Sequence, residues 1–177
     1  MLKIIEYLMQ DYYTDTDSFK IKLKYMGKAL LWPSSPAAKI CVLIRLGHYF
    51  AVRKLKFLRQ WCEFGIYKKY NCTISCKINI GKGLFLPHPQ GIVIGEECTI
   101  GENVTIYQNV TIGRKDEGTC KYPKIMNDVI IYCNSTIIGD VIIGRGSIIG
   151  AHSLVLSNVE ENSVYVGCPA KMTKGRK

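Results

Sequence analysis

The sequence predicts a mainly β fold, in which a solenoid of short strands follows an α-helical segment. Near residue 70 the chain changes from helical spacing of Lys, Arg, Leu, Tyr and Phe to short Ile- and Val-rich pieces separated by glycines. Aliphatic residues then recur at every sixth position. The 177-residue chain is 47% hydrophobic and 21% charged, which is typical of a globular protein. We therefore expect a basic helical segment over residues 1–68 and a β solenoid over residues 69–177.

The N-terminal segment divides into two helical stretches. Thr16 or Asp17 is a suitable N-cap for the first, and the Pro-rich break "WPSSP" at residues 32–36 separates it from the second. Residues 45–69 are basic and aromatic, a composition that suits peripheral contact with an anionic membrane. Alternatively, these helices pack on the end of the solenoid or form an oligomer contact. Their uncharged runs are far shorter than the roughly 20 residues of a transmembrane helix. No base-stacking motif accompanies the charge, so we expect no nucleic acid partner.

The second half repeats with a period of six residues, which fits short strands joined by tight turns, three to a coil. Glycine often follows the aliphatic anchor, and a small or β-branched residue lies four positions after it. We therefore expect Ile94 to stack against Ile112, and Ile131 against Ile149. The anchors are Ile94, Ile100, Ile106 and Ile112, then Ile125, Ile131, Ile137, Ile143, Ile149 and Val155, with an earlier set (Ile74, Ile80, Leu86 and Ile92) two residues out of phase.

Two interruptions break the repeat. The phase shift lies directly after a turn that contains His88, and the thirteen residues from Ile112 to Ile125 are not a multiple of six. Residues 113–124 must therefore leave the coil as a loop. Loops extruded from a rigid scaffold are frequent places for function, although a tolerated surface insertion is the alternative.

Charge and cysteine content limit the partners, metal sites and cellular compartments to be expected for the protein. The formal net charge of +10 favours an anionic partner. The eight cysteines form no CxxC pair, and Cys72-x3-Cys76 lacks a second half with metal-ligand spacing, so we expect free thiols and no metal site. The first residues lack the pattern of a secretory signal, which favours a cytoplasmic protein, with the inner face of the membrane as a further option.

His88 is the histidine best placed for chemistry. Pro87 and Pro89 restrict its backbone, and an unperturbed imidazole accepts protons near neutral pH. His48 lies in the helical segment and is better explained as a packed or interfacial residue. His152 falls at a repeat turn, where simple exposure explains it.

From about residue 66 to its end, the chain resembles the serine O-acetyltransferase branch of the hexapeptide acyltransferases. The resemblance rests on "INIGKGLFLPHPQGIVIGE", "VTIYQNVTIG", "YPKI", "IIGRGSIIGAHSLVL" and "VYVGCPAKM". It implies a left-handed parallel β-helix, against the usual right-handed crossover rule. It also implies a homotrimer whose neighbouring subunits bind acetyl-CoA between them.

The resemblance assigns roles to particular residues. His88 would be the general base that deprotonates an acceptor hydroxyl for attack on the thioester of acetyl-CoA. Positions matching the family's pantetheine and nucleotide contacts are Gly113, Tyr132, Cys133, Gly150, Ala151 and, in the Pro-Ala-Lys element, Lys171.

The sequence departs from the family's acceptor site. Two family Asp residues that flank and support the base align with Pro87 and Thr73, and an Arg-His pair that helps to hold serine aligns with Lys121 and Tyr122. The "LPHPQG" turn is closer in style to capsular and colanic-acid polysaccharide O-acetyltransferases. We therefore expect O-acetylation of a saccharide hydroxyl, with Lys121 and Tyr122 near the acceptor. The alternatives are a divergent serine O-acetyltransferase of cysteine biosynthesis, a non-catalytic scaffold, and a carbonic-anhydrase-like metal enzyme, for which the repeats supply too few histidines.

Overall fold

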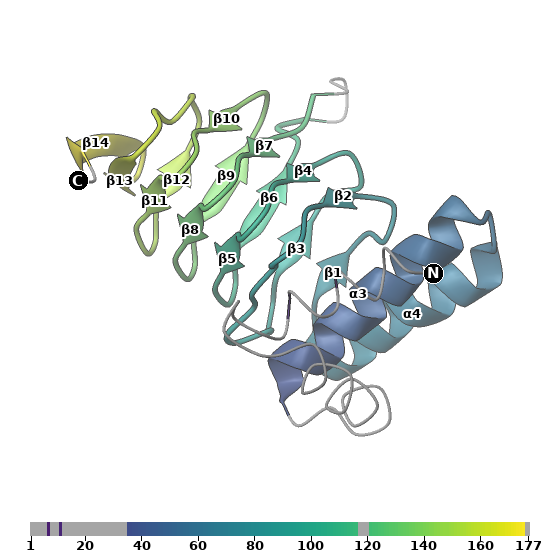
Figure 1. The fold of residues 1–177 in the computed structure, drawn as a ribbon. Coiled ribbons are helices and arrows are strands. Elements are labelled where there is room, and N and C mark those ends of the chain that lie inside the picture. Colours follow the sequence, from purple (N-terminus) through teal and green to yellow (C-terminus); the bar gives the residue numbers. More distant parts are fainter. Residues whose placement is uncertain (1–6, 8–10, 12–34, 117–120, 176–177) are drawn as a thin grey trace.

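The computed structural model describes residues 7, 11, 35–116 and 121–175, in which two helices precede a stack of short strands (Figure 1). Helix α3 spans Pro36–Val52 and helix α4 spans Lys56–Tyr70, two residues beyond the predicted boundary. The Ser35 side chain accepts a hydrogen bond from the Ala38 N–H, and Pro36 occupies the first turn, so α3 begins with favourable capping. The predicted helix capped by Thr16 or Asp17 lies outside the described residues.

The strands form three sheets, all parallel except for a C-terminal antiparallel pair. Sheet A contains β1 (Thr73–Ile74), β3 (Val93–Ile94), β6 (Thr111–Gly113), β9 (Thr136–Ile138) and β12 (Leu154–Val155). Sheet B contains β2 (Asn79–Ile80), β4 (Thr99–Ile100), β7 (Lys124–Ile125) and β10 (Ile142–Ile143). Sheet C contains β5 (Thr105–Ile106), β8 (Ile130–Ile131), β11 (Ile148–Ile149) and the antiparallel pair β13 (Ser163–Gly167) and β14 (Ala170–Gly175).

The pairing register confirms the predicted coil. Ile94 pairs with Ile112, and Ile131 pairs with Ile149, each one coil of eighteen residues apart. The side chains of the anchors point inward: none of those within the strands is more than 5% exposed. Both interruptions are present: Thr73 pairs with Val93, across the His88 turn, and Thr111 pairs with Thr136, across the predicted loop. The extra residues therefore leave the coil without disturbing the stack.

At the corners that follow sheets B and C, the backbone is left-handed three residues after the anchor. Asn109, Asn134 and His152 have φ values of 56°, 60° and 57° and stack in successive coils. Asn109 Nδ2 donates to Asn134 Oδ1 at 3.0 Å, and Asn134 Nδ2 lies 3.3 Å from His152 Nε2. Asn tolerates this conformation better than most residues. His152 is thus the exposed end of a corner ladder.

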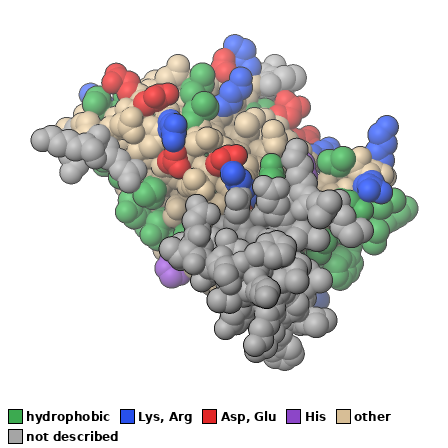
Figure 2. All heavy atoms as spheres, viewed as in Figure 1, with side chains coloured by type: hydrophobic (Ala, Val, Ile, Leu, Met, Phe, Trp, Pro, Cys, Tyr) green, Lys and Arg blue, Asp and Glu red, His purple; other side chains and the backbone are tan. Residues whose placement is uncertain are grey.

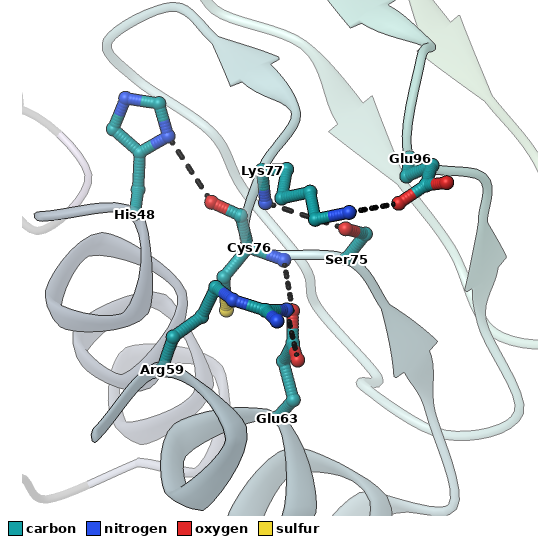
Figure 3. Close-up of polar contacts among 7 residues, drawn as sticks. All are labelled: His48, Arg59, Glu63, Ser75, Cys76, Lys77 and Glu96. Carbon is teal, nitrogen blue, oxygen red and sulfur yellow. Dashed lines mark hydrogen bonds and ion pairs between the residues drawn. The ribbon is translucent and has the colours of Figure 1, made fainter. Parts of the chain in front are cut away.

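The inner faces of α3 and α4 cover the first coil, as one interpretation of the sequence anticipated. Ile40, Ile44, Cys62 and Ile66 are buried in the same core as the anchors of the stack. Polar contacts fix this junction (Figure 3): Glu63 accepts a hydrogen bond from the Cys76 N–H at 2.9 Å and pairs with Arg59. His48 Nδ1 lies 3.2 Å from the Cys76 carbonyl oxygen, so His48 belongs to the junction.

The outer face of α4 is strongly apolar and exposed. Phe57 is 87% exposed and Trp61 is 66% exposed. Figure 2 shows hydrophobic side chains gathered at the helical end of the molecule, with Lys and Arg side chains beside them. Among the described residues, no helix is long and apolar enough to cross a membrane.

Candidate active site

The His88 turn lies where the chain passes from sheet C to sheet A. Phe85 bridges to β5 before the turn, and β3 follows it. The Gln90 N–H donates to the His88 carbonyl oxygen at 2.8 Å, and the Asn109 N–H of the next coil donates to the Gln90 carbonyl at 2.9 Å. Pro89 is buried, whereas the His88 side chain is exposed. The turn is therefore fixed to the stack while its imidazole faces outward.

A cavity of about 600 Å³ opens beside this imidazole. The two helices and the solenoid form its walls together, which explains why the helical hairpin matters to the site. Its lining residues are Pro36 and Lys39 from α3, Lys69 and Tyr70 from α4, Pro87, His88, Pro89 and Gln90 from the turn, and Gln108 from the next coil.

The charged side chains that line this cavity are cationic. Its lining includes two lysines and no Asp or Glu. Lys39 is half-buried and Lys69 is exposed, and within the described residues neither takes part in an ion pair. The Gln108 Oε1 atom is buried and lacks a hydrogen-bond partner among the described residues. The two lysines of the lining therefore make the cavity suited to an anionic ligand.

A series of residues follows one edge of the solenoid away from His88. This C–A edge, where sheet C turns into sheet A, carries His88, Tyr107, Tyr132 and Gly150 in successive coils. The ring centroids of His88 and Tyr107 are 6.3 Å apart, and those of Tyr107 and Tyr132 are 5.0 Å apart and stacked. Within the described part of the chain, no hydrogen bond or ion pair holds the His88 imidazole. Its ring contact is with Tyr107.

The predicted donor-site residues fall on two edges. Tyr132 and Cys133 lie beside Gly150 and Ala151, because the His152 N–H donates to the Cys133 carbonyl oxygen and β8 pairs with β11. Lys171 on β14 pairs with Val166, whose side chain lies against Gly150. Gly113 ends β6 on the edge between sheets A and B, where an added Cβ would meet no atom within 4 Å.

The predicted acceptor residues do not line the His88 cavity of the same chain. Lys121 is exposed, and its Nζ donates to Asp140 Oδ2 at 2.7 Å, an interaction that raises the pKa of Lys121. Tyr122 is half-buried, with its ring against Gly95. Sequence reasoning missed Lys39, Lys69 and Tyr107. Tyr107 directly follows a repeat anchor, but nothing in the spacing of the two lysines connects them with His88.

The part of the chain that the structure describes contains no group of three or more His, Cys, Asp or Glu residues arranged to hold a metal ion.

Comparison with known proteins identifies relatives across most of the chain. The bacterial transferase hexapeptide family (six repeats) matches residues 122–157. A serine acetyltransferase of Bacillus pumilus is 34% identical over 155 residues, which are 86% of this chain and 66% of that protein. A serine acetyltransferase of Bacillus subtilis is 33% identical over 156 residues, 87% of this chain and 67% of that protein. Against a serine acetyltransferase of Buchnera aphidicola, the match spans only 47% of the relative.

Solved structures give the same result for the fold. A Neisseria gonorrhoeae serine acetyltransferase in complex with serine superposes with a TM-score of 0.78 at 29% identity, over 98% of this chain and 69% of that chain. A serine acetyltransferase in complex with CoA superposes with a TM-score of 0.78 at 26% identity, over 97% of this chain and 69% of that chain. The fold is thus the left-handed parallel β-helix of hexapeptide repeats, as expected.

The prediction of a saccharide acceptor is wrong, because the relatives and solved structures named above are serine acetyltransferases. That expectation depended on side chains that are missing, because Thr73, Pro87, Lys121 and Tyr122 replace the family's polar groups. A missing carboxylate shows that one set of contacts is absent. It does not identify the substrate that takes their place.

Similarity to the Bacillus subtilis protein covers two thirds of that relative, and the six-residue repeat and the β-helix accompany it. The chain therefore belongs to the hexapeptide-repeat acyltransferase family, in the group that contains the serine acetyltransferases.

Proposed function

We propose that the protein is a serine O-acetyltransferase, which transfers the acetyl group of acetyl-CoA to the hydroxyl of L-serine with His88 as general base. The observation that carries this proposal is the cavity beside His88, in a chain whose relatives are serine acetyltransferases. The related structures with serine and with CoA support the choice of both substrates.

The turn geometry suits direct transfer between the two bound substrates. The His88 imidazole takes the proton of the serine hydroxyl as the oxygen attacks the thioester carbonyl carbon. The tetrahedral intermediate collapses, the C–S bond breaks, and the imidazolium returns its proton to the departing CoA sulfur. O-acetylserine and CoA leave. A positioned base of this kind contributes roughly 10²- to 10⁴-fold to the rate. The two prolines and the Gln90 N–H contact restrict the turn, which reduces the entropy lost in reaching the reactive geometry.

The donor would follow the C–A edge toward the C-terminus. Tyr132, Cys133, Gly150 and Ala151 lie next to one another there, and Lys171 follows at the end of the stack. Gly113 lies on a different edge, so one chain alone does not assemble all the expected contacts. We propose a homotrimer, in which the neighbouring subunit brings the Gly113 edge, and Lys121 and Tyr122 with it, toward the C–A edge. Light scattering after size exclusion should give the mass of three chains.

Release of CoA from acetyl-CoA in the presence of L-serine tests the reaction. Chromatographic detection is needed because the eight cysteines of the protein would react with a thiol dye. We expect serine-dependent CoA release, confirmed by mass spectrometry of O-acetylserine, and a loss of roughly 10²- to 10⁴-fold in His88→Ala. His152→Asn is the matched control, because it removes another exposed histidine of the C–A edge and keeps a residue that tolerates the corner φ of 57°. A wild-type protein that leaves serine unmodified would contradict the proposal.

A further inference from the structure

We propose that Lys39 and Lys69 hold the carboxylate of the amino-acid acceptor, so that the helical hairpin determines acceptor specificity in this chain. This inference rests on the proposed acetylation of serine and adds to it the residues that recognise serine as an amino acid. It assigns a binding role to two side chains that are far apart in the sequence and lie in different helices.

The two lysines share one cavity with the base. Lys39 lies in the first turn of α3 and Lys69 in the last turn of α4, and both line the cavity that His88 also lines. Because α3 and α4 pack against the first coil in one continuous core, the lysines are attached to the same rigid unit as the base. An acceptor bound in this cavity would present its hydroxyl to His88 and its charged end to the helices.

The electrostatics of the cavity favour a bound anion. Half-burial of Lys39 removes part of its hydration, and no Asp or Glu lines the cavity to compensate either cation. A carboxylate placed between the two lysines would gain charge-assisted hydrogen bonds from both. The cavity thus offers two cations to the carboxylate end of an amino acid and no competing anion of its own.

The edge assigned to the donor lies on the other side of His88 from these lysines. Tyr107, Tyr132 and Gly150 extend along the C–A edge from His88 toward the C-terminal end of the stack, whereas the lysines lie on the helical side of His88. Figure 1 shows the helices and strands β13 and β14 at opposite ends of the molecule. The base therefore lies between the two cations and the edge assigned to the donor. This arrangement is the one that direct transfer requires.

The test compares L-serine with L-serinamide, which keeps the hydroxyl and lacks the carboxylate. The variants are Lys39→Gln, Lys69→Gln and the double variant, and Lys56→Gln is the control because it removes an equal charge from α4 outside the cavity lining. We expect each cavity variant to raise the KM for serine by about 10- to 100-fold, the range of a lost charge-assisted hydrogen bond. Turnover of serinamide and the KM for acetyl-CoA should stay at the wild-type level, and Lys→Arg variants should recover serine preference.

The outcomes separate the inference from the proposed function. In one outcome the wild type acetylates serine while the cavity variants prefer serine over serinamide as strongly as Lys56→Gln does. That result would contradict the carboxylate site and leave the proposed reaction intact. A raised KM for acetyl-CoA in place of serine would reassign the lysines to the donor phosphates and also overturn the inference. Equilibrium dialysis with labelled L-serine gives a readout that needs no turnover: binding by the wild type and its loss in the double variant would support the site even if serine were not acetylated.

Discussion

Burial determines which cysteine thiols of this protein can react with reagents in solution. Five described cysteines are buried among the anchors and helices, namely Cys41, Cys62, Cys72, Cys76 and Cys98, whereas Cys168 is exposed. Burial raises the pKa of the Cys76 and Cys98 thiols to about 12, because the thiolate loses its hydration in the core. These two residues act as small apolar filler in the solenoid.

The first prediction concerns thiol reactivity. Because the thiolate is the reactive species, iodoacetamide at pH 8 should alkylate Cys168 within minutes, and Cys76 and Cys98 only after unfolding. Peptide mapping by mass spectrometry, with and without denaturant, measures each site separately. Rapid labelling of Cys98 in the native protein would show that the coil opens at that corner.

At the scale of elements, the helical hairpin and the first coil approach each other closely at one glycine. A Cβ on Gly47 of α3 would lie 2.8 Å from the Cys76 Cβ and closer still to its sulfur. Gly65 of α4 has room, since an added Cβ would meet its nearest neighbour, in the Leu43 side chain, at 3.7 Å. The absence of a side chain at Gly47 therefore allows the hairpin to lie close against the first coil.

The second prediction uses the same substitution at these two positions. Gly47→Ala should destabilise the protein by about 1–3 kcal/mol, because the methyl group cannot fit without moving the coil. Gly65→Ala should stabilise it by about 0.5–1 kcal/mol, because alanine favours the helix and has space. Urea denaturation measures both. Equal effects of the two changes would mean that the hairpin does not dock as tightly as the Gly47 contact requires.

The third prediction concerns the outer face of α4. This face carries the exposed side chains of Phe57, Trp61 and Phe64. Lys56 of the same helix and Arg53 and Lys54 of the preceding connection are exposed as well, so the charge of this region is complementary to an anionic lipid surface. The membrane contact suggested by the sequence therefore stays a prediction. The protein should cosediment with vesicles rich in phosphatidylglycerol and not with phosphatidylcholine vesicles, and a Phe57→Ser, Trp61→Ser double variant should lose this binding. If neither the wild type nor the double variant binds vesicles, and the double variant has a smaller mass by light scattering, the face is an interface between subunits of this protein.

At the scale of the whole molecule, much of the fold could be predicted from the sequence, because the repeat is a local pattern. The six-residue period fixed the stacking of Ile94 on Ile112, and the two interruptions revealed the His88 turn and the extruded loop. The cavity was not predictable in the same way. Its walls join Lys39, Lys69 and His88, whose proximity depends on how the hairpin docks, and no periodicity encodes that contact. The same limit explains the wrong acceptor: the sequence showed which family groups were missing, but not which helical side chains lie nearby.

The final prediction concerns cooperativity between the hairpin and the stack. In a solenoid each coil contacts only its neighbours, so distant coils can unfold separately. Here the buried residues of the helices and of all coils form one continuous core. Ile131 is fully buried in the middle of the stack, whereas Ile142 is 45% exposed. Ile131→Ala should cost about 2–5 kcal/mol, and Ile142→Ala less than about 1 kcal/mol.

Hydrogen exchange measured peptide by peptide makes this prediction a test of the whole molecule, because it follows α4 and the central strands separately. If the core is one cooperative unit, Ile131→Ala should lower the urea midpoint of the α4 peptides and that of the strand peptides by the same amount. A shift confined to the strand signal would mean that the hairpin folds apart from the central coils. The cavity walls would then depend on the first coils alone, and His88 and the two lysines would keep their relative positions even when the donor edge unfolds.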